Sequence, residues 1–514
     1  MILALSSNMI GIVFSGELDG FEAKLIKVEV DLSKGLPGWH MVGLPEKGVQ
    51  ESKERVGAAL RNIGIQLEPR KTTINLAPAA LKKRGNQYDL PMAIGLLKAH
   101  NLVQHDLQNL FFVGELSLTG ELKPIHGSLL FSFLAKQQRF GAILLPAENA
   151  REAALVSQLT VIGCRNLVDV LDFLNKGVVP LSPSLNGARP AATKQPDFAE
   201  VKGQSFAKRA LEIAAAGLHH AVMVGPPGSG KTMLAGRLPS ILPKLTEKES
   251  MEVTKIYSAL GLLPVDQPLI NAAPFRAPHH SISYAGLVGG GSGSLSSGEI
   301  TLAHNGVLFM DELPEFHRDC LQMLRQPIET GWIFIARSGQ RRKLPARFQL
   351  IAAMNPCKCG YLGHPTRYCV CDPGKVLQYR DKISGPLFDR FDLQIEISSV
   401  TEEDLFENRA TESSAEIFQR VLAARAKQAR RFQKTAITCN GNMSHRQLEQ
   451  FCALQPEIKA YFRDCFVKLQ LSARAHDRIL KVARTIADLG NSPEIEKHHI
   501  AEAIQFRSFD REGV

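Results

Sequence analysis

The stretch that decides the fold is residues 221–232, AVMVGPPGSGKT: a short apolar run followed by a glycine-rich loop that ends in Lys-Thr. The loop matches G-x-x-x-x-G-K-[ST] in full, and the MLAGRL that follows is compatible with a helix. In such a loop the glycines allow backbone N–H groups to face phosphate oxygens, and the helix N-terminus adds its dipole. The stretch therefore predicts a strand–loop–helix unit that binds the phosphates of a nucleotide.

We expect the whole loop to take part in nucleotide binding. The predicted binding residues are Gly225, Pro226, Pro227, Gly228, Ser229, Gly230, Lys231 and Thr232. Lys231 is expected to reach the β- and γ-phosphates, and Thr232 to hold Mg²⁺. The alternative is a strand–helix turn without a ligand, and the complete match in the right context argues against it.

Two further apolar runs end in polar residues. Val307–Met310 precedes Asp311 and Glu312, and Leu350–Ala353 precedes Met354 and then Asn355. Continuous apolar runs are typical of strands buried on both faces of a parallel sheet. The carboxyl ends of such strands form the ligand crevice of open α/β sheets. We therefore expect these polar residues to lie near the glycine-rich loop.

Together these residues predict nucleotide hydrolysis. Asp311 is expected to ligate Mg²⁺ directly or through water, Glu312 to polarise the attacking water, and Asn355 to orient that water. Taken singly, the acidic pair also fits a solvated turn or a helix cap, and Asn-Pro fits a turn. The prediction thus depends on all three strand ends. ATP is favoured over GTP because no N/T-K-x-D motif follows.

Length and composition limit the class of protein. A chain of 514 residues is too long to form a single hydrophobic core, so two or three domains are expected. Its composition, with 44% hydrophobic and 22% charged residues, excludes a wholly disordered chain. The 61 Lys and Arg against 51 Asp and Glu, a net charge of +10, favour an anionic partner, nucleic acid before membrane. Nine cysteines do not make a disulfide framework. With neither a signal-peptide n-region nor a membrane-spanning run, the sequence predicts a soluble, cytoplasmic protein.

The chain is predicted to have four parts. Residues 177–199, rich in Pro, Ser, Gly and Ala, read as a linker between an α+β domain at 1–176 and an α/β core at 200–399. Residues 400–514 are helical in pattern and basic. The clearest runs in the first domain are strands at Lys24–Asp31, Thr73–Leu76 and Gly141–Leu145 and helices at Gln50–Ile63 and Met92–His100. The predicted fold class is therefore multidomain, α/β and α+β.

The motifs resemble a known family. GPPGSGKT, GVLFMDE, AAMNP and the LFDRFD of Leu387–Asp392 are similar to AAA+ ATPases of the magnesium-chelatase-like branch. Residues 274–290, PFRAPHHSISYAGLVGG, and a cysteine block narrow the resemblance to the ComM/YifB family. It implies a Lon-like N-terminal domain, a P-loop AAA+ core and a C-terminal helical lid. It also implies ATP and Mg²⁺ as cofactors, and a homohexamer with active sites between subunits.

The resemblance assigns roles to two arginines. Arg390 matches the arginine finger that reaches the neighbouring subunit's γ-phosphate, and Arg474 matches the sensor-2 arginine of the lid. The alternative for Arg390 is a surface ion pair with Asp389 or Asp392, and for Arg474 a solvated helix charge. Arg478 lies one turn further along the same face of the helix and is the other candidate for the sensor-2 arginine.

The N-terminal part resembles the Lon protease domain, of ribosomal S5 domain 2-like fold, at GELSLTG (114–120) and KPIHG (123–127). Lon-type proteolysis needs a serine activated by a lysine. Alignment on this pattern places Gln87 and Leu129 at the positions of the nucleophile and the base. Neither can perform that chemistry, so we expect no protease activity and a role in assembly or DNA contact.

Residues 333–348, IFIARSGQRRKLPARF, predict a basic hairpin. Its cations are Arg337, Arg341, Arg342, Lys343 and Arg347. By position it resembles the hairpin that helicases of this branch push against DNA, and such a hairpin can follow phosphates without reading sequence. A solvated charged hairpin is the alternative. Residues 274–298, rich in Gly and Ser toward their end, read as a flexible insertion or, by resemblance, as the helix-2 insertion that points into the ring pore.

The loop at 357–371 carries four cysteines in the pattern C-x-C-x9-C-x-C. They are Cys357, Cys359, Cys369 and Cys371. Four thiolates in one short loop predict a tetrahedral structural zinc site, although C-x-C is tighter than the usual C-x2-C. His364 is an alternative fourth ligand, and a metal-free loop is the alternative to any site.

The resemblance implies a function: an ATP-driven hexameric helicase that promotes branch migration and integrates DNA during homologous recombination and natural transformation. The expected partners are single-stranded and branched DNA, other copies of the chain and recombination proteins, without a membrane. The alternative is a chelatase-like or chaperone-like ATPase that remodels a protein partner, but no partner module is recognisable. A non-catalytic binding protein conflicts with the complete ATPase motifs.

Overall fold

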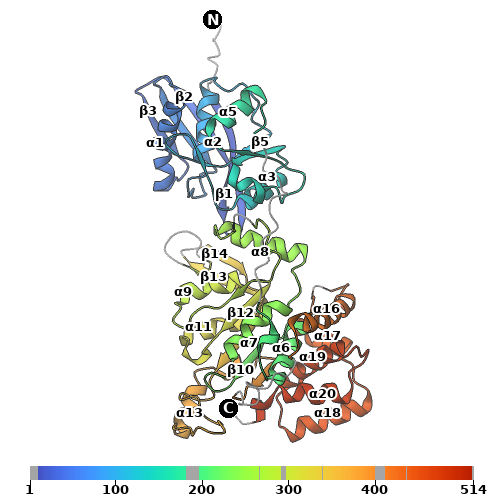
Figure 1. The fold of residues 1–514 in the computed structure, drawn as a ribbon. Coiled ribbons are helices and arrows are strands. Elements are labelled where there is room, and N and C mark those ends of the chain that lie inside the picture. The colour runs from blue at the N-terminus through green and yellow to red at the C-terminus, as the bar shows by residue number, and fades with distance from the viewer. Residues whose placement is uncertain are drawn as a thin grey trace. The chain divides into compact units, whose positions relative to one another are not determined.

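The computed structural model places most of the chain. It describes residues 10–180, 196–264, 267–290, 297–337, 340–399, 411–435 and 437–511. The chain forms two compact units, and their helices and strands are labelled in Figure 1. The first unit comprises Met1–Ala191 with Ser250–Ile270, and the second Ala192–Glu249 with Asn271–Val514. Within the described ranges no helix is both long and apolar enough to cross a bilayer.

The first unit is built on a seven-stranded mixed sheet in the order β3-β4-β2-β1-β5-β8-β9. Its strands are β1 (Ile10–Asp19), β2 (Glu22–Ser33), β3 (Gly38–Val42), β4 (Lys71–Ala77), β5 (Leu110–Phe112), β8 (Ala142–Pro146) and β9 (Thr160–Cys164). Its helices include α1 (Lys47–Asn62), α2 (Asp89–Ala99), α3 (Ser128–Gln137), α4 (Ala150–Ala153) and α5 (Leu167–Lys176). The predicted strands and helices of this unit are confirmed as β2, β4, β8, α1 and α2. Every residue of α2 except Lys98 is buried, which is why its sequence lacks a polar face.

A helix from the middle of the chain belongs to the first unit. Most of α8 (Glu247–Ala259) packs there, although the sequence places it within the predicted core at 200–399. The Ser258 hydroxyl is hydrogen-bonded to Glu152, its carbonyl accepts from Gly127 N at 2.9 Å, and Lys255 Nζ lies 3.8 Å from the Phe133 ring centroid. The chain therefore enters this unit twice, by contacts that sequence spacing does not reveal.

The positions aligned with the Lon nucleophile and base hold no such pair. Gln87 Nε2 lies 3.3 Å from Glu17 Oε2, and Tyr88 donates to the same oxygen at 2.5 Å. Burial raises the pKa of Glu17 to about 7, against the lowering effect of the Tyr88 hydrogen bond. Leu129 is fully buried in an apolar cluster. The two positions therefore support the structure of the unit and carry no group suited to peptide cleavage.

The second unit contains a parallel five-stranded sheet in the order β11-β12-β15-β10-β16. The strands are β10 (Ala221–Val224), β11 (Phe275–Arg276), β12 (Gly306–Met310), β15 (Phe348–Met354) and β16 (Leu393–Glu396). Every residue of β10, β12 and β15 is buried, which confirms the prediction made from their apolar runs. The neighbouring helices are α6 (Ser205–Gly217), α7 (Lys231–Arg237), α9 (Tyr284–Val288), α10 (Glu299–Leu302), α11 (Arg318–Met323), α12 (Arg325–Thr330), α13 (Pro373–Arg380) and α14 (Gly385–Phe388).

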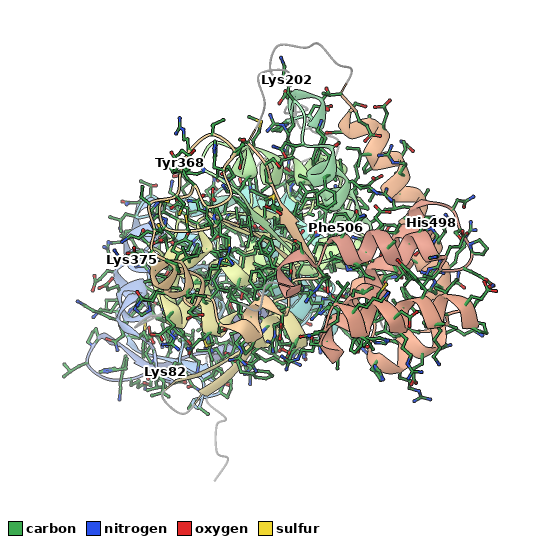
Figure 2. The ribbon with its side chains drawn as sticks, turned by 90° about the horizontal axis from the view of Figure 1, so that it is seen from below. Lys82, Lys202, Tyr368, Lys375, His498 and Phe506 are labelled. Atoms are coloured by element: carbon green, nitrogen blue, oxygen red, sulfur yellow. The ribbon has the colours of Figure 1, made fainter. Side chains whose placement is uncertain are left out.

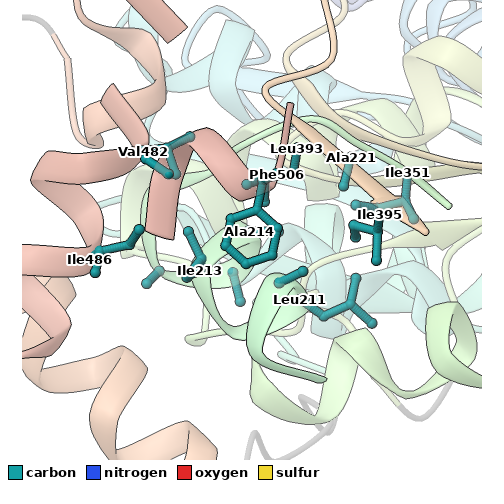
Figure 3. Packing of buried hydrophobic residues seen from close by; sticks show 14 of the residues in the cluster. Leu211, Ile213, Ala214, Ala221, Ile351, Leu393, Ile395, Val482, Ile486 and Phe506 are labelled. Atoms are coloured by element: carbon teal, nitrogen blue, oxygen red, sulfur yellow. The ribbon is translucent and has the colours of Figure 1, made fainter. Parts of the chain in front are cut away.

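The C-terminal helices share a core with this sheet. They are α16 (Ser414–Arg431), α17 (His445–Phe451), α18 (Pro456–Lys468), α19 (Ala473–Leu489) and α20 (Lys497–Gln505). Ser413 and Glu416 form a capping box that begins α16. Figure 3 shows Leu211 and Ile213 of α6 in the same cluster as Leu393 of β16 and Ile486 of α19. The mixed α/β architecture with a helical C-terminal part thus agrees with the predicted fold class.

Candidate active site

The strand order brings the predicted catalytic residues to one edge of the sheet. β15 lies between β12 and β10, with Met354 opposite Val224 and Ala352 opposite Met310. The residues that follow these three strands therefore emerge side by side. Because the strands themselves are fully buried, the first polar side chains after them form the site.

Lys231 lies at the centre of this edge, at the start of α7. Its Nζ donates to the carbonyl oxygens of Gly225 at 2.7 Å and Pro226 at 2.8 Å, and to Asn355 Oδ1 at 3.2 Å. Burial lowers the pKa of Lys231, and the nearby Asp311 and Glu312 carboxylates oppose this effect. The ammonium is thus held by neutral oxygens, for which a phosphate is a stronger acceptor.

The loop has the backbone that this arrangement requires. Gly228 and Gly230 have φ values of +75° and +87°, a region that favours glycine. A Cβ at Gly225 would lie 2.4 Å from the carbonyl oxygen of Ile397, so no larger residue fits there. Within the described part of the chain the buried Ser229 hydroxyl has no hydrogen-bond partner, as expected of a group that awaits a ligand oxygen.

Thr232 and Asp311 lie in contact. The Thr232 hydroxyl donates to Asp311 Oδ2 at 2.6 Å, while Asp311 Oδ1 accepts from the Glu312 backbone N–H at 2.9 Å. A hydroxyl and a carboxylate are hard oxygen ligands of the kind that Mg²⁺ takes. The residues present therefore fit a magnesium–nucleotide complex, with Lys231 and Ser229 on the phosphate side.

Glu312 is paired with a histidine that the sequence analysis did not assign. His280 Nδ1 lies 3.1 Å from Glu312 Oε2, and the His279 and His280 ring centroids are 4.1 Å apart. Glu312 has a φ of +52° and its side chain is 54% exposed, so the carboxylate stands at the surface of the site. The sequence signal that could have identified His280 is the pair of adjacent histidines, His279 and His280, shortly after strand β11.

Arg390 has a partner that sequence reasoning did not foresee. Its guanidinium donates to Glu329, in α12, and to the Pro386 carbonyl oxygen, and its side chain is 11% exposed. The ion pair suggested as the alternative, with Asp389 or Asp392, is replaced by this one. A contact with a neighbouring subunit lies beyond a single chain, so the arginine-finger role stays a prediction.

The two lid arginines have different environments. Arg474 NH1 lies 3.2 Å from Asp389 Oδ2 with 64% of its side chain exposed, whereas Arg478 donates to the buried Asp392 at 2.6 Å. Burial alone would raise the pKa of Asp392, but Arg478 and His219 hold it well below its usual range. Arg478 is thus committed to a structural ion pair. Arg474 contacts Asp389, which lines a pocket together with Val224, Met354, Arg380 and Ser472.

The predicted basic hairpin is present. β13 (Trp332–Arg337) pairs antiparallel with β14 (Gln340–Pro345), with Phe334 opposite Lys343. Lys343 and Arg347 are exposed and Arg342 is partly buried. The side chains of Arg337 and Arg341 lie outside the described residues, as do residues 291–296 of the predicted insertion.

The four cysteines of the 357–371 loop come together. The Sγ of Cys357 lies 3.3 Å from that of Cys359 and 3.6 Å from that of Cys369, and all four sulfurs lie within 4.8 Å of one another. Four sulfurs at about 2.3 Å from one zinc ion would be about 3.8 Å apart. The donor set therefore fits zinc.

His364 is not a member of this group. Its Nδ1 accepts from the backbone N–H groups of Thr366 and Arg367 at 3.2 and 3.1 Å. Tyr368, next to Cys369, is 94% exposed and projects from the same loop (Figure 2). The alternative in which His364 replaces a cysteine is therefore less compatible with this geometry than a four-cysteine site.

Comparisons with known proteins show the family to which the chain belongs. Family models described as "Magnesium chelatase, subunit ChlI", "Subunit ChlI of Mg-chelatase" and "Magnesium chelatase, subunit ChlI C-terminal" match residues 197–405, 28–149 and 411–507. The chain is similar to the competence protein ComM of Haemophilus influenzae, with 42% identity over 98% of both chains. It is also 44% identical to the uncharacterized protein YifB of Salmonella typhimurium over 96% of both chains. An uncharacterized protein of Mycobacterium tuberculosis is 40% identical over 97% of this chain and 98% of its own.

Replacement of Glu312 by Gln tests the assignment of the site. Glu312→Gln should still bind ATP with Mg²⁺ but hydrolyse it about 100-fold more slowly or worse, because the amide cannot accept the proton of water. Lys231→Ala, the matched control, should lose ATP binding itself. Fluorescent-nucleotide binding and phosphate release measure the two effects. Hydrolysis by Glu312→Gln at the unmodified rate would contradict the assignment.

Proposed function

Because the chain belongs to the ComM/YifB family of magnesium-chelatase-like AAA+ ATPases, we propose that it is an ATP-driven hexameric DNA helicase of the cytoplasm. It promotes branch migration and integrates DNA during homologous recombination and natural transformation. The observation that carries the proposal is the gathering of Lys231, Thr232, Asp311 and Asn355 at one sheet edge, whose strand β15 follows directly after a basic hairpin in the chain. The name of the Haemophilus influenzae relative supports the role in competence.

The path of the chain supports a motor. β14 ends at Pro345 and β15 begins at Phe348, so the hairpin leads directly into the strand that ends next to Asn355. All of β15 is buried between β12 and β10, which makes it a stiff connection of about 23 Å. A movement of Asn355 when ATP is hydrolysed can therefore be transmitted to the hairpin through β15.

The chain's own residues account for hydrolysis. Mg²⁺ held by Thr232 and Asp311 would neutralise charge on the β- and γ-phosphates. Lys231 exchanges its loop carbonyl acceptors for phosphate oxygens. Glu312 leaves His280 and accepts the proton of the attacking water, while Asn355 orients that water by a hydrogen bond. These steps use groups that already lie at the sheet edge.

A second candidate function is an ATPase that remodels a protein partner. It is favoured by the matching family models, which bear the name of magnesium chelatase. The two candidates differ in what stimulates hydrolysis, since a DNA motor responds to DNA and a chelatase-like protein to its protein partner. The basic hairpin and the net charge of +10 favour DNA.

DNA should stimulate the ATPase and bind at the hairpin. The variant Lys343→Ala, which removes the exposed cation opposite Phe334, should bind single strands more weakly, with a salt dependence reduced by about 0.7 in log–log slope. Lys375→Ala, an exposed lysine of α13, is the control and should behave like the unmodified protein. Fluorescence anisotropy and strand displacement on branched substrates measure these effects. An ATPase that neither binds nor responds to DNA would exclude the helicase.

Arg390→Ala should leave the fold and ATP binding intact but reduce hydrolysis by about 1,000-fold, because a trans-acting arginine stabilises transition-state charge. Glu329→Gln removes the in-chain partner and keeps the guanidinium, so it should retain most of the activity. Circular dichroism, sedimentation and phosphate release on both variants give the answer. Equal losses of activity in the two variants would mean that Arg390 acts only through its ion pair with Glu329 and is not an arginine finger.

We propose that the four-cysteine cluster holds a structural zinc ion. Protein purified without chelators should contain about one zinc per chain, and Cys369→Ser/Cys371→Ser should lose it and unfold at a lower temperature. Cys465→Ser, a cysteine of α18 outside the cluster, is the control and should keep the metal. Elemental analysis and thermal unfolding are the measurements. Unmodified protein without zinc after growth in zinc-supplemented medium would refute the site.

A further inference from the structure

The two faces of the hairpin differ sharply. Residues directly opposite each other in an antiparallel pair share a face, so Phe334 and Lys343 lie on one face and Ile333 and Leu344 on the other. Ile333 is 1% and Leu344 3% exposed, which means that their face packs against the protein. Trp332, two residues before Phe334, shares the outward face; it is 38% exposed and Phe334 is 52% exposed.

The outward face combines aromatic rings with a cation. Lys343 Nζ lies 3.9 Å from the centroid of the Trp332 ring, and Lys343 is also the cross-strand partner of Phe334. An exposed phenylalanine beside a lysine contributes little to folding, because half of its surface stays in water. Aromatic rings alternating with cations are what single-stranded nucleic acid needs: bases stack on the rings and phosphates contact the ammonium groups.

We propose that Phe334 and Trp332 form a stacking platform for the unpaired bases of a single strand, with Lys343 on its phosphates. The inference rests on the proposed DNA motor, and it adds that the hairpin contacts the bases of the single strand as well as its phosphates. The platform selects single strands because the bases of a duplex are already stacked inside it. It is indifferent to sequence because every base presents a π-face. The charge-only hairpin expected from the sequence would lack this preference.

The competing occupant of this face is a second copy of the chain. Lys343 argues against it, because charged residues are depleted from the cores of protein interfaces, whereas the lysine here lies over the Trp332 ring and is the cross-strand partner of Phe334. Nucleic acid satisfies the rings and the charge together. The test below separates the two occupants.

Substitutions at Phe334 separate stacking from general hydrophobicity. Phe334→Leu keeps an apolar side chain without a π-face and should weaken binding to an oligo(dT) single strand about tenfold, with an unchanged salt slope. Phe334→Tyr keeps the ring and should bind within about twofold of the unmodified protein. Lys343→Ala should instead lower the slope by about 0.7. Anisotropy titrations at several salt concentrations, with a non-hydrolysable ATP analogue present, measure all three.

Trp332 supplies a direct readout. The chain has two tryptophans, Trp39 and Trp332, so Trp39→Phe leaves Trp332 as the sole indole fluorophore. Stacking of a base on Trp332 should quench its emission when oligo(dT) is added. The quenching should saturate at the same DNA concentration as the anisotropy.

The outcomes are distinct. If the unmodified protein binds oligo(dT) but Phe334→Leu and Phe334→Tyr bind equally well, or Trp332 emission stays unchanged, the platform is refuted while the DNA motor stands. If Phe334→Leu instead breaks the oligomer in sedimentation, the face is a subunit contact and the platform is likewise refuted. If the unmodified protein binds no DNA at all, the proposed function fails and the platform with it.

Discussion

The site depends on the burial of three neighbouring parallel strands on both faces. Within β10, β12 and β15 every residue is buried, so a charged side chain in any of them would lack both water and a partner. The three strands carry no charged residue, and the one polar side chain among them, Gln349, is hydrogen-bonded to the Ala214 and His219 carbonyl oxygens; charged groups are therefore found only after the strands. Because β15 lies between the other two, these positions adjoin, and Lys231, Asp311 and Asn355 meet without a long loop to hold them.

Strand β15 also connects three parts of the molecule that are separate motifs in the sequence: the basic hairpin, Asn355 and the four-cysteine loop. The hairpin enters β15, Asn355 follows it, and Cys357 begins the four-cysteine loop two residues later. That loop packs back on the phosphate-binding loop: a Cβ at Gly360 would lie 2.6 Å from the Pro227 side chain. A metal that shapes the cysteine loop would thus support the position of Asn355 and of the phosphate loop together.

The parts predictable from sequence are those encoded locally. The continuous apolar runs of β10, β12 and β15 and the glycine pattern before Lys231 each carry their own signal, and the structure agrees with them. Contacts between distant segments carry no such signal. The Glu312–His280 pair, the Arg390–Glu329 pair and the packing of α8 in the first unit each depend on side chains that only the folded chain brings together. Spacing suggested Asp389 or Asp392 for Arg390 merely because they are near in sequence.

The charged groups of the site share one further property: each has a partner within the chain that the substrate must replace. Lys231 is held by loop carbonyl oxygens, Asp311 by the Thr232 hydroxyl, and Glu312 by His280. A partly buried charge needs such a partner when no nucleotide is bound, because leaving it unpaired costs several kcal/mol. When these partners within the chain are exchanged for phosphate and Mg²⁺, neutral or weaker contacts are replaced by charge-assisted ones. Part of the free energy of nucleotide binding is therefore used to rearrange the site. If Glu312 is the residue that accepts a proton from water, as proposed above, its exchange of His280 for that water would tie hydrolysis to a correctly bound nucleotide.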